Sequence, residues 1–246
     1  MHPPAPAGPA RSLVLVPGMS GRASDDFPFL LPMLERECEV VPVEVPHGRL
    51  PGNLDDLVGL VGAAVHRCSA PPVVVGYSIG AVSAAAFAAA NPFAVDSLAL
   101  ICGWVEPPPK LRAFCDLWTA STNADELAAA AEFALFSADG WESARLPRVD
   151  ELSRRLVRLS GSVGLTDVIE AVRQPTLVIG CAHDEVATTA QSKLLFGAVA
   201  DARYLELASG HALVHERPAE LLSAIVDFVR APAGFAAGSL IGEDRP

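Results

Sequence analysis

Residues 73–81, Val-Val-Val-Gly-Tyr-Ser-Ile-Gly-Ala, constrain the fold more than any other part of this sequence. Three consecutive β-branched residues predict a buried strand, and the alanine-rich run that follows predicts a helix. Between them, Gly76, Ser78 and Gly80 match G-x-S-x-G, in which a serine occupies a sharp strand-to-helix turn with its hydroxyl exposed. The glycines are needed because side chains at their positions would collide in so tight a turn. The stretch predicts a candidate nucleophile at Ser78; the alternative is an ordinary glycine-bracketed turn.

The composition fits one compact domain. The chain has 246 residues, 51% of them hydrophobic, but no apolar run reaches the roughly 18 to 20 residues that span a bilayer. Its formal net charge of -11 and its lack of a Lys/Arg cluster argue against binding to nucleic acid or to an anionic membrane. The five scattered cysteines and the absence of an apolar leader favour reduced thiols and a cytoplasmic location.

Strand and helix patterns alternate along most of the chain, which is typical of a mostly parallel, doubly wound α/β sheet. We expect a disordered tail at 1–11, a core formed by 12–103 and 173–230, and a flexible tail at 231–246. A single helix is expected over 25–36, with Pro28 and Pro32 confining or kinking it. The segment 202–207 is expected to be the last strand.

Residues 104–172 interrupt the alternation with amphipathic helical segments and hold all three tryptophans, Trp104, Trp118 and Trp141. An aromatic-rich helical insertion at the end of a sheet strand predicts a lid over a site at the strand ends. We expect Trp104 and Trp118 to contact the substrate, together with Tyr77 beside the serine. The alternative is a helical appendage that only packs against the core.

A catalytic serine needs a base and a carboxylate that orients the base. Of the six histidines, His211 is the best candidate because it follows the last expected strand within Ser-Gly-His. Asp184 follows the preceding strand, with Glu185 beside it as the second choice. The chain order Ser78, Asp184, His211 is the order expected after a G-x-S-x-G turn.

An oxyanion formed during acyl transfer must also meet hydrogen-bond donors. The backbone amide of Ile79, directly after the serine, is one candidate. The amide of Met19, in the glycine-rich turn after the first strand, is the other.

Together these segments resemble the α/β-hydrolase superfamily, and most closely its short bacterial members, over about residues 12–230. The resemblance is carried by Leu-Val-Leu-Val-Pro-Gly at 13–18, Gly-Tyr-Ser-Ile-Gly at 76–80, Pro-Thr-Leu-Val-Ile-Gly-Cys-Ala-His-Asp at 175–184, and Ser-Gly-His with Glu-Arg-Pro at 209–211 and 216–218. It implies an α/β-hydrolase fold with a helical lid and no cofactor or metal. It implies the same roles for Ser78, Asp184, His211, Met19 and Ile79. Many members have His-Gly where this chain has Pro-Gly at 17–18.

Three functions fit these residues. The first is hydrolysis of an ester or thioester of an apolar, small to medium acyl substrate through an acyl-enzyme, as in a tailoring step of a biosynthetic pathway. The second is transfer of the acyl group to a nucleophile other than water, and the third is ligand binding without catalysis. The expected partner is a small molecule, including an acyl thioester on a carrier.

Overall fold

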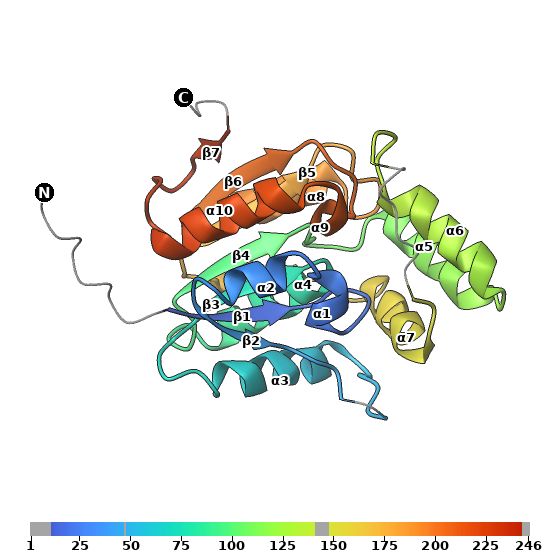
Figure 1. The fold of residues 1–246 in the computed structure, drawn as a ribbon, viewed down its shortest axis with the longest axis horizontal. Helices are drawn as coiled ribbons and strands as arrows, with labels where there is room; N and C mark the ends of the chain where they lie inside the picture. Colours follow the sequence, from blue (N-terminus) through green and yellow to red (C-terminus); the bar gives the residue numbers. More distant parts are fainter. Residues whose placement is uncertain (1–10, 47, 141–147, 243–246) are drawn as a thin grey trace, which may run out of the picture.

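The computed structural model describes residues 11–46, 48–140 and 148–242. Seven strands form one sheet in the order β2-β1-β3-β4-β5-β6-β7, and each neighbouring pair is parallel (Figure 1). The strands are β1 (Ser12–Val16), β2 (Glu39–Pro42), β3 (Val73–Tyr77), β4 (Ser97–Ile101), β5 (Thr176–Cys181), β6 (Ala202–Leu207) and β7 (Leu240–Ile241). The predicted parallel α/β sheet is confirmed.

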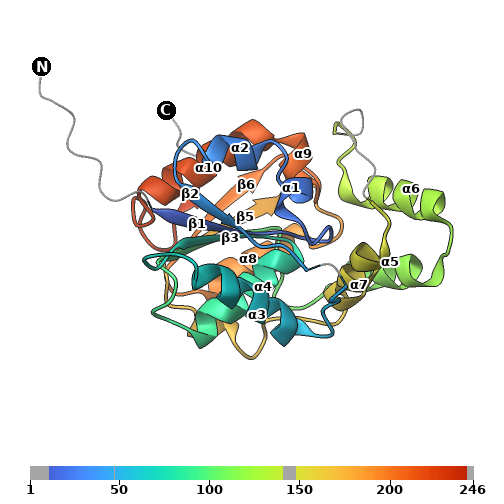
Figure 2. The same ribbon diagram turned by 60° about the horizontal axis from the view of Figure 1, so that its bottom comes forward.

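Helices cover both faces of this sheet. In Figure 2, α1, α2, α9 and α10 lie on one face, and α3, α4 and α8 lie on the other. The helices are α1 (Ala23–Asp26), α2 (Leu30–Leu34), α3 (Leu54–Val65), α4 (Ile79–Ala90), α5 (Pro109–Ala120), α6 (Ala124–Leu135), α7 (Glu151–Ser160), the short 3-10 turn η2 (Ile169–Ala171), α8 (Thr189–Ala198), α9 (Leu213–Glu216) and α10 (Pro218–Arg230). No helix in these described ranges is long and apolar enough to cross a bilayer.

The two faces of the sheet have separate cores, because successive side chains of a strand point to opposite faces. In β1, Leu13 and Leu15 pack with α2 and α10, whereas Val14 and Val16 pack with α3 and α4. All four side chains are buried. Because helices cover both faces, the sequences of the strands are continuous apolar runs and do not alternate between apolar and polar residues.

The periphery of the fold differs from the sequence-based expectation in three respects. The helix expected over 25–36 is two short helices, α1 and α2, since Pro28 lies between them. The strand at 202–207 is not the last, because Leu240 and Ile241 pair with Tyr204 and Leu205. The C-terminal segment is therefore tied to the sheet at this point, contrary to the expected flexible tail. Residues 1–10 of the expected disordered N-terminal tail, and Trp141, lie outside the described residues.

Helices α5, α6 and α7 come from the segment between β4 and β5 and lie beside the sheet, next to the loops at the carboxyl ends of its strands (Figure 2). Helix α7 begins with a capping box in which Asp150 and Ser153 exchange hydrogen bonds. Arg155 of this helix donates from Nε to the carbonyl oxygen of Pro51 at 2.7 Å. This bond links the inserted helices to the loop before α3.

Candidate active site

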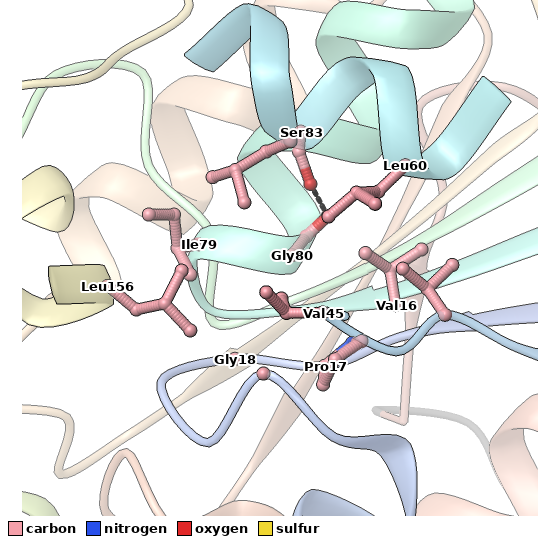
Figure 3. Close-up of a pocket in the computed structure, with 12 residues that line it drawn as sticks. Val16, Pro17, Gly18, Val45, Leu60, Ile79, Gly80, Ser83 and Leu156 are labelled. Atoms are coloured by element: carbon pink, nitrogen blue, oxygen red, sulfur yellow. Dashed lines mark hydrogen bonds between the residues drawn. The ribbon is translucent and has the colours of Figure 1, made fainter. Parts of the chain in front are cut away.

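The turn between β3 and α4 has the strained geometry expected of a nucleophile turn. Ser78 has φ 57° and ψ −123°, a backbone conformation that is costly for a residue with a side chain. A Cβ atom at Gly76 would lie 2.5 Å from the carbonyl oxygen of Gly80, and one at Gly80 would lie 2.4 Å from that of Pro17. Figure 3 shows Gly80 at the start of α4 and Pro17 on the loop below it. The amide of Ser78 donates to Ile101 in β4 at 2.8 Å, so the neighbouring strand also holds the turn.

Ser78, His211 and Asp184 form a continuous hydrogen-bonded chain. His211 Nε2 lies 2.9 Å from Ser78 Oγ, and His211 Nδ1 lies 2.8 Å from Asp184 Oδ2. The three residues come from the loops after β3, β6 and β5, respectively. All three are buried, with Ser78 the most accessible at 9%. The structure thus brings together the three side chains that the sequence singled out.

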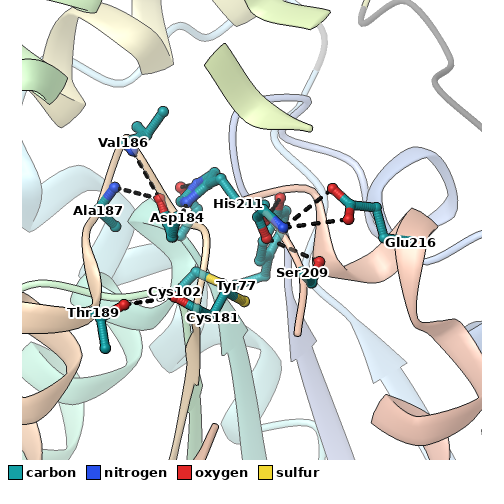
Figure 4. A network of polar contacts seen from close by, with 12 residues as sticks. Tyr77, Cys102, Cys181, Asp184, Val186, Ala187, Thr189, Ser209, His211 and Glu216 are labelled. Carbon is teal, nitrogen blue, oxygen red and sulfur yellow. Dashed lines mark hydrogen bonds and ion pairs between the residues drawn. The ribbon is translucent and has the colours of Figure 1, made fainter. Parts of the chain in front are cut away.

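The second oxygen of Asp184 is also fixed. Its Oδ1 accepts hydrogen bonds from the amides of Val186 and Ala187, each at 2.8 Å (Figure 4). Burial alone would raise the pKa of Asp184, but His211 and these two amides outweigh burial and lower it. Asp184 is therefore held as a carboxylate. Glu185, the second choice from sequence, is exposed and pairs with Lys110 instead of His211.

Tyr77 supports the backbone of His211. Its hydroxyl donates to the carbonyl oxygen of His211 at 2.9 Å, and the two rings lie 5.6 Å apart between centroids. Burial holds the pKa of Tyr77 well above its ordinary value, so the phenol remains protonated and can donate. Tyr77 also borders the cavity at Ser78, where we expected a substrate contact.

The two expected oxyanion donors both lie near the serine. Ile79 begins α4, and Met19 borders the same cavity as Ser78. Within the described ranges, neither backbone amide has a hydrogen-bond acceptor, which leaves both able to donate to a ligand.

The turn that contains Met19 is anchored by Asp26, a residue that sequence reasoning did not select. The Asp26 carboxylate accepts the amide of Gly18 at 2.6 Å. Burial raises the pKa of Asp26 to about 7, although hydrogen bonds from Ser20 and Gly18 oppose the shift. Asp26 therefore holds the residue before Met19 and is half-protonated near neutral pH.

Two neighbouring cavities lie at the site, and one of them borders the serine. A narrow cavity of about 30 Å³ borders Ser78 and His211, and a larger one of about 720 Å³ lies among α5, α6 and the loop after β5. Phe114 and Val186 border both cavities. The larger cavity is mostly apolar, and its other lining residues are Lys110, Phe133, Ala134, Phe136, Ser137, Ala138 and Glu185. The inserted helices therefore border the site.

Trp104 and Trp118 do not have the substrate-facing positions that we expected. Both side chains are fully buried, and neither is among the residues that border these two cavities. The indole nitrogen of Trp104 donates to Val163 at 2.8 Å, and the Trp118 ring packs against Phe114 with centroids 5.4 Å apart. Both tryptophans serve as core residues of the insertion, and Phe114 lies between that core and the cavity.

Within the described part of the chain, one cluster has the composition of a metal site. Cys102, Asp184 and His211 offer ligand atoms that lie within 4.8 Å of one another. A cation there would have to displace the hydrogen bond between Asp184 and His211 and ionise Cys102. Burial, followed by the neighbouring Cys181, holds the pKa of Cys102 well above its ordinary value. The cluster therefore suits a hydrogen-bonded network better than a cation (Figure 4).

Known proteins resemble this chain over most of its length. The pyrrolizixenacetamide deacetylase of Xenorhabdus hominickii is 25% identical over 244 residues, covering 90% of this chain and 92% of that protein. The enol-lactonase of Burkholderia xenovorans LB400 shares the fold with a TM-score of 0.78 and 23% identity, over 91% of this chain and 92% of that chain. A thermophilic esterase from Thermogutta terrifontis does so with a TM-score of 0.72 and 16% identity, over 92% of each chain. The model of the alpha/beta hydrolase family matches residues 13–224. From β1 into α10, this chain belongs to the alpha/beta hydrolase family.

Proposed function

We propose that this protein is a serine hydrolase that cleaves an ester or thioester of an apolar acyl group through an acyl-enzyme. The observation that carries the proposal is the buried hydrogen-bonded chain from Ser78 Oγ through His211 to Asp184. Family membership supports hydrolysis as the general reaction. Ser78 is the nucleophile, His211 the general base, and Asp184 the group that orients His211.

In the first half-reaction, Ser78 Oγ attacks the acyl carbon while His211 Nε2 takes the hydroxyl proton. The carbonyl oxygen becomes an oxyanion and accepts hydrogen bonds from the amides of Met19 and Ile79. The C–O or C–S bond to the leaving group then breaks, and the leaving group takes the proton from His211. Loss of one oxyanion donor typically costs about 100- to 1000-fold in rate.

In the second half-reaction, water attacks the acyl ester on Ser78 and gives a proton to His211. The ester bond to Ser78 breaks, the acyl group leaves as a carboxylic acid, and the proton returns to Ser78 Oγ. Asp184 remains a carboxylate throughout and stabilises the imidazolium that forms in each half. Its lowered pKa supports this role.

The shape of the site supports a substrate with an apolar arm. The cavity at Ser78 is narrow, whereas the adjoining cavity under α5 and α6 is large and lined by several phenylalanines. The arm extends from Ser78 past Phe114 and Val186 and excludes water as it fills the larger cavity. Helices α5 and α6 act in this proposal as a lid that selects substrates.

An acetamide is a second candidate substrate class. The relative from Xenorhabdus hominickii is named a deacetylase of an acetamide and aligns with 90% of this chain. The same three residues can cleave an amide if His211 protonates the leaving amine. In that case the acyl group at Ser78 is small, and the apolar arm belongs to the leaving group.

Turnover of a graded substrate panel tests the proposal. The panel contains p-nitrophenyl esters and N-acetylcysteamine thioesters of increasing acyl length, together with N-acetyl arylamines. Ser78→Ala should abolish turnover of every substrate. Ser160→Ala is the matched control, because Ser160 borders the same cavity but donates to Leu156 at 2.9 Å. Retention of a tenth of wild-type turnover by Ser78→Ala would exclude the acyl-enzyme.

A further inference from the structure

Glu216 connects two distant parts of the chain next to the site. Its Oε1 accepts the amide of Ser137 at 2.8 Å, and its Oε2 accepts the Ser137 hydroxyl at 2.5 Å. Both oxygens also lie within reach of the amide of Gly210, at 3.2 and 3.3 Å (Figure 4). Ser137 follows the C-terminal end of α6, and Gly210 directly precedes His211. One half-buried carboxylate therefore joins the inserted helices to the loop of the histidine.

The residue after His211 is tied to the same helix end. The amide of Ala212 donates to the carbonyl oxygen of Leu135 at 2.8 Å, and Leu135 is the last residue of α6. Both neighbours of His211 are thus held by the C-terminal end of α6, Ala212 directly and Gly210 through Glu216. Tyr77 holds the carbonyl oxygen of His211 from the sheet side.

The contact between α6 and the histidine loop leaves no space at Gly210. A Cβ atom at this position would lie 2.6 Å from both the carbonyl oxygen of Leu135 and the amide nitrogen of Ser137. The backbones of the two segments are therefore in direct contact. Because a packed junction transmits displacements, a shift of the α6 end moves Gly210 and, with it, His211.

We propose that Glu216 is a positioning residue that couples the end of α6 to the placement of His211. The inference rests on the proposed function, since His211 is the base in that reaction. Without the carboxylate, the amides of Ser137 and Gly210 lose their acceptor. The histidine loop then gains freedom, and His211 no longer keeps its distance to Ser78. A displacement of about 1 Å in a catalytic constellation can lower a rate by about 100-fold.

Two readouts test this role in the full-length protein. The first is the rate constant for reaction of Ser78 with a fluorophosphonate, corrected for the folded fraction at each protein concentration. The second is the ¹H NMR signal of the Nδ1 proton shared by His211 and Asp184, which needs no substrate. The variants are Glu216→Ala, Glu216→Gln, Ser137→Ala and the double variant Glu216→Ala/Ser137→Ala. The control is Glu220→Gln, which changes an exposed glutamate whose ion pair is with Arg217 at 3.8 Å.

We expect Glu216→Ala to slow labelling by about 10- to 100-fold and to shift or broaden the Nδ1 proton signal. Glu216→Gln should recover part of the rate because its carbonyl oxygen still accepts one amide. Ser137→Ala should have a smaller effect in the wild type and none in Glu216→Ala, since the two residues act through one contact. Glu220→Gln should match the wild type in both readouts.

A wild-type labelling rate and an unchanged Nδ1 proton signal in Glu216→Ala would overturn the proposal, even with a lowered melting temperature. Additive effects of Glu216→Ala and Ser137→Ala would overturn the coupling to α6. If the wild type itself is not labelled, the proposed function fails. The Nδ1 proton signal then decides the positioning role, and an unchanged signal in Glu216→Ala and Glu216→Gln overturns it.

Discussion

Replacing Asp26 with asparagine should stabilise the protein at alkaline pH and alter its pH dependence. Burial raises the pKa of Asp26 from 3.8 to about 7, which corresponds to about 4 kcal/mol of unfavourable free energy for the charged form. Between pH 3.8 and about 7, Asp26 is therefore protonated in the folded state and deprotonated in the unfolded state. The contribution of Asp26 to stability falls as pH rises from about 4 to about 7 and is constant above pH 7. Asparagine removes this dependence while its carbonyl oxygen can still accept the amide of Gly18.

Urea unfolding at pH 5 and pH 8 measures the effect. The stability of Asp26→Asn relative to wild type should increase by about 3 kcal/mol between these two pH values, because about two pH units of the window lie between them. Asp25→Asn is the matched control: Asp25 is the adjacent, exposed carboxylate and makes only a minor contribution to the raised pKa of Asp26, so this variant should show a much smaller increase. Equal pH dependence in wild type and Asp26→Asn would refute the reasoning that burial dominates at this site.

Three further substitutions, two of them paired with a control variant, test the local geometry. Asp184→Asn should lower kcat by about 10⁴-fold because it favours the wrong histidine tautomer, whereas Glu185→Gln should leave kcat nearly unchanged; the reverse ranking in steady-state assays would transfer the orienting role to Glu185. Gly80→Ala should lower the melting temperature sharply because its Cβ atom meets a backbone oxygen at 2.4 Å. Gly197→Ala, at a helical position with open space, should raise it slightly, and similar values for the two would contradict the close approach. Phe114→Ala should join the two cavities and shift kcat/KM toward longer acyl chains, so an equal change for all chain lengths would remove Phe114 from the specificity region.

The sequence was sufficient to predict six of the seven strands and the three polar residues at the edge of the sheet. Apolar runs of five or six residues define the central strands, and the carboxyl ends of parallel strands meet at one edge. Ser78, Asp184 and His211 follow three of these strands, so their meeting is a consequence of topology. The nucleophile turn has no space for side chains at positions 76 and 80, and the glycines that meet this requirement are visible in the sequence itself.

What the sequence did not reveal depends on contacts between distant segments. Trp104 and Trp118 were predicted to be lid residues that face the substrate, but both are buried. The packing of the inserted helices against one another decides which side chains face the site, and the local sequence does not contain that information. Strand β7 has two residues in a Gly/Ala-rich segment, and it exists because β6 offers a free edge. The proposed role of Glu216 depends on the position of the C-terminal end of α6 beside the loop of His211. No local sequence pattern predicts that these two segments are in contact.

Mass spectrometry of the fluorophosphonate-treated protein tests the central claim most directly. The account predicts a single adduct on the peptide that contains Ser78, its loss in Ser78→Ala, and strongly slowed labelling in His211→Ala. The Ser160→Ala control should be labelled at the wild-type rate. An adduct on another residue, or labelling of Ser78 at the same rate without His211, would contradict the assignment of Ser78 as a nucleophile activated by His211.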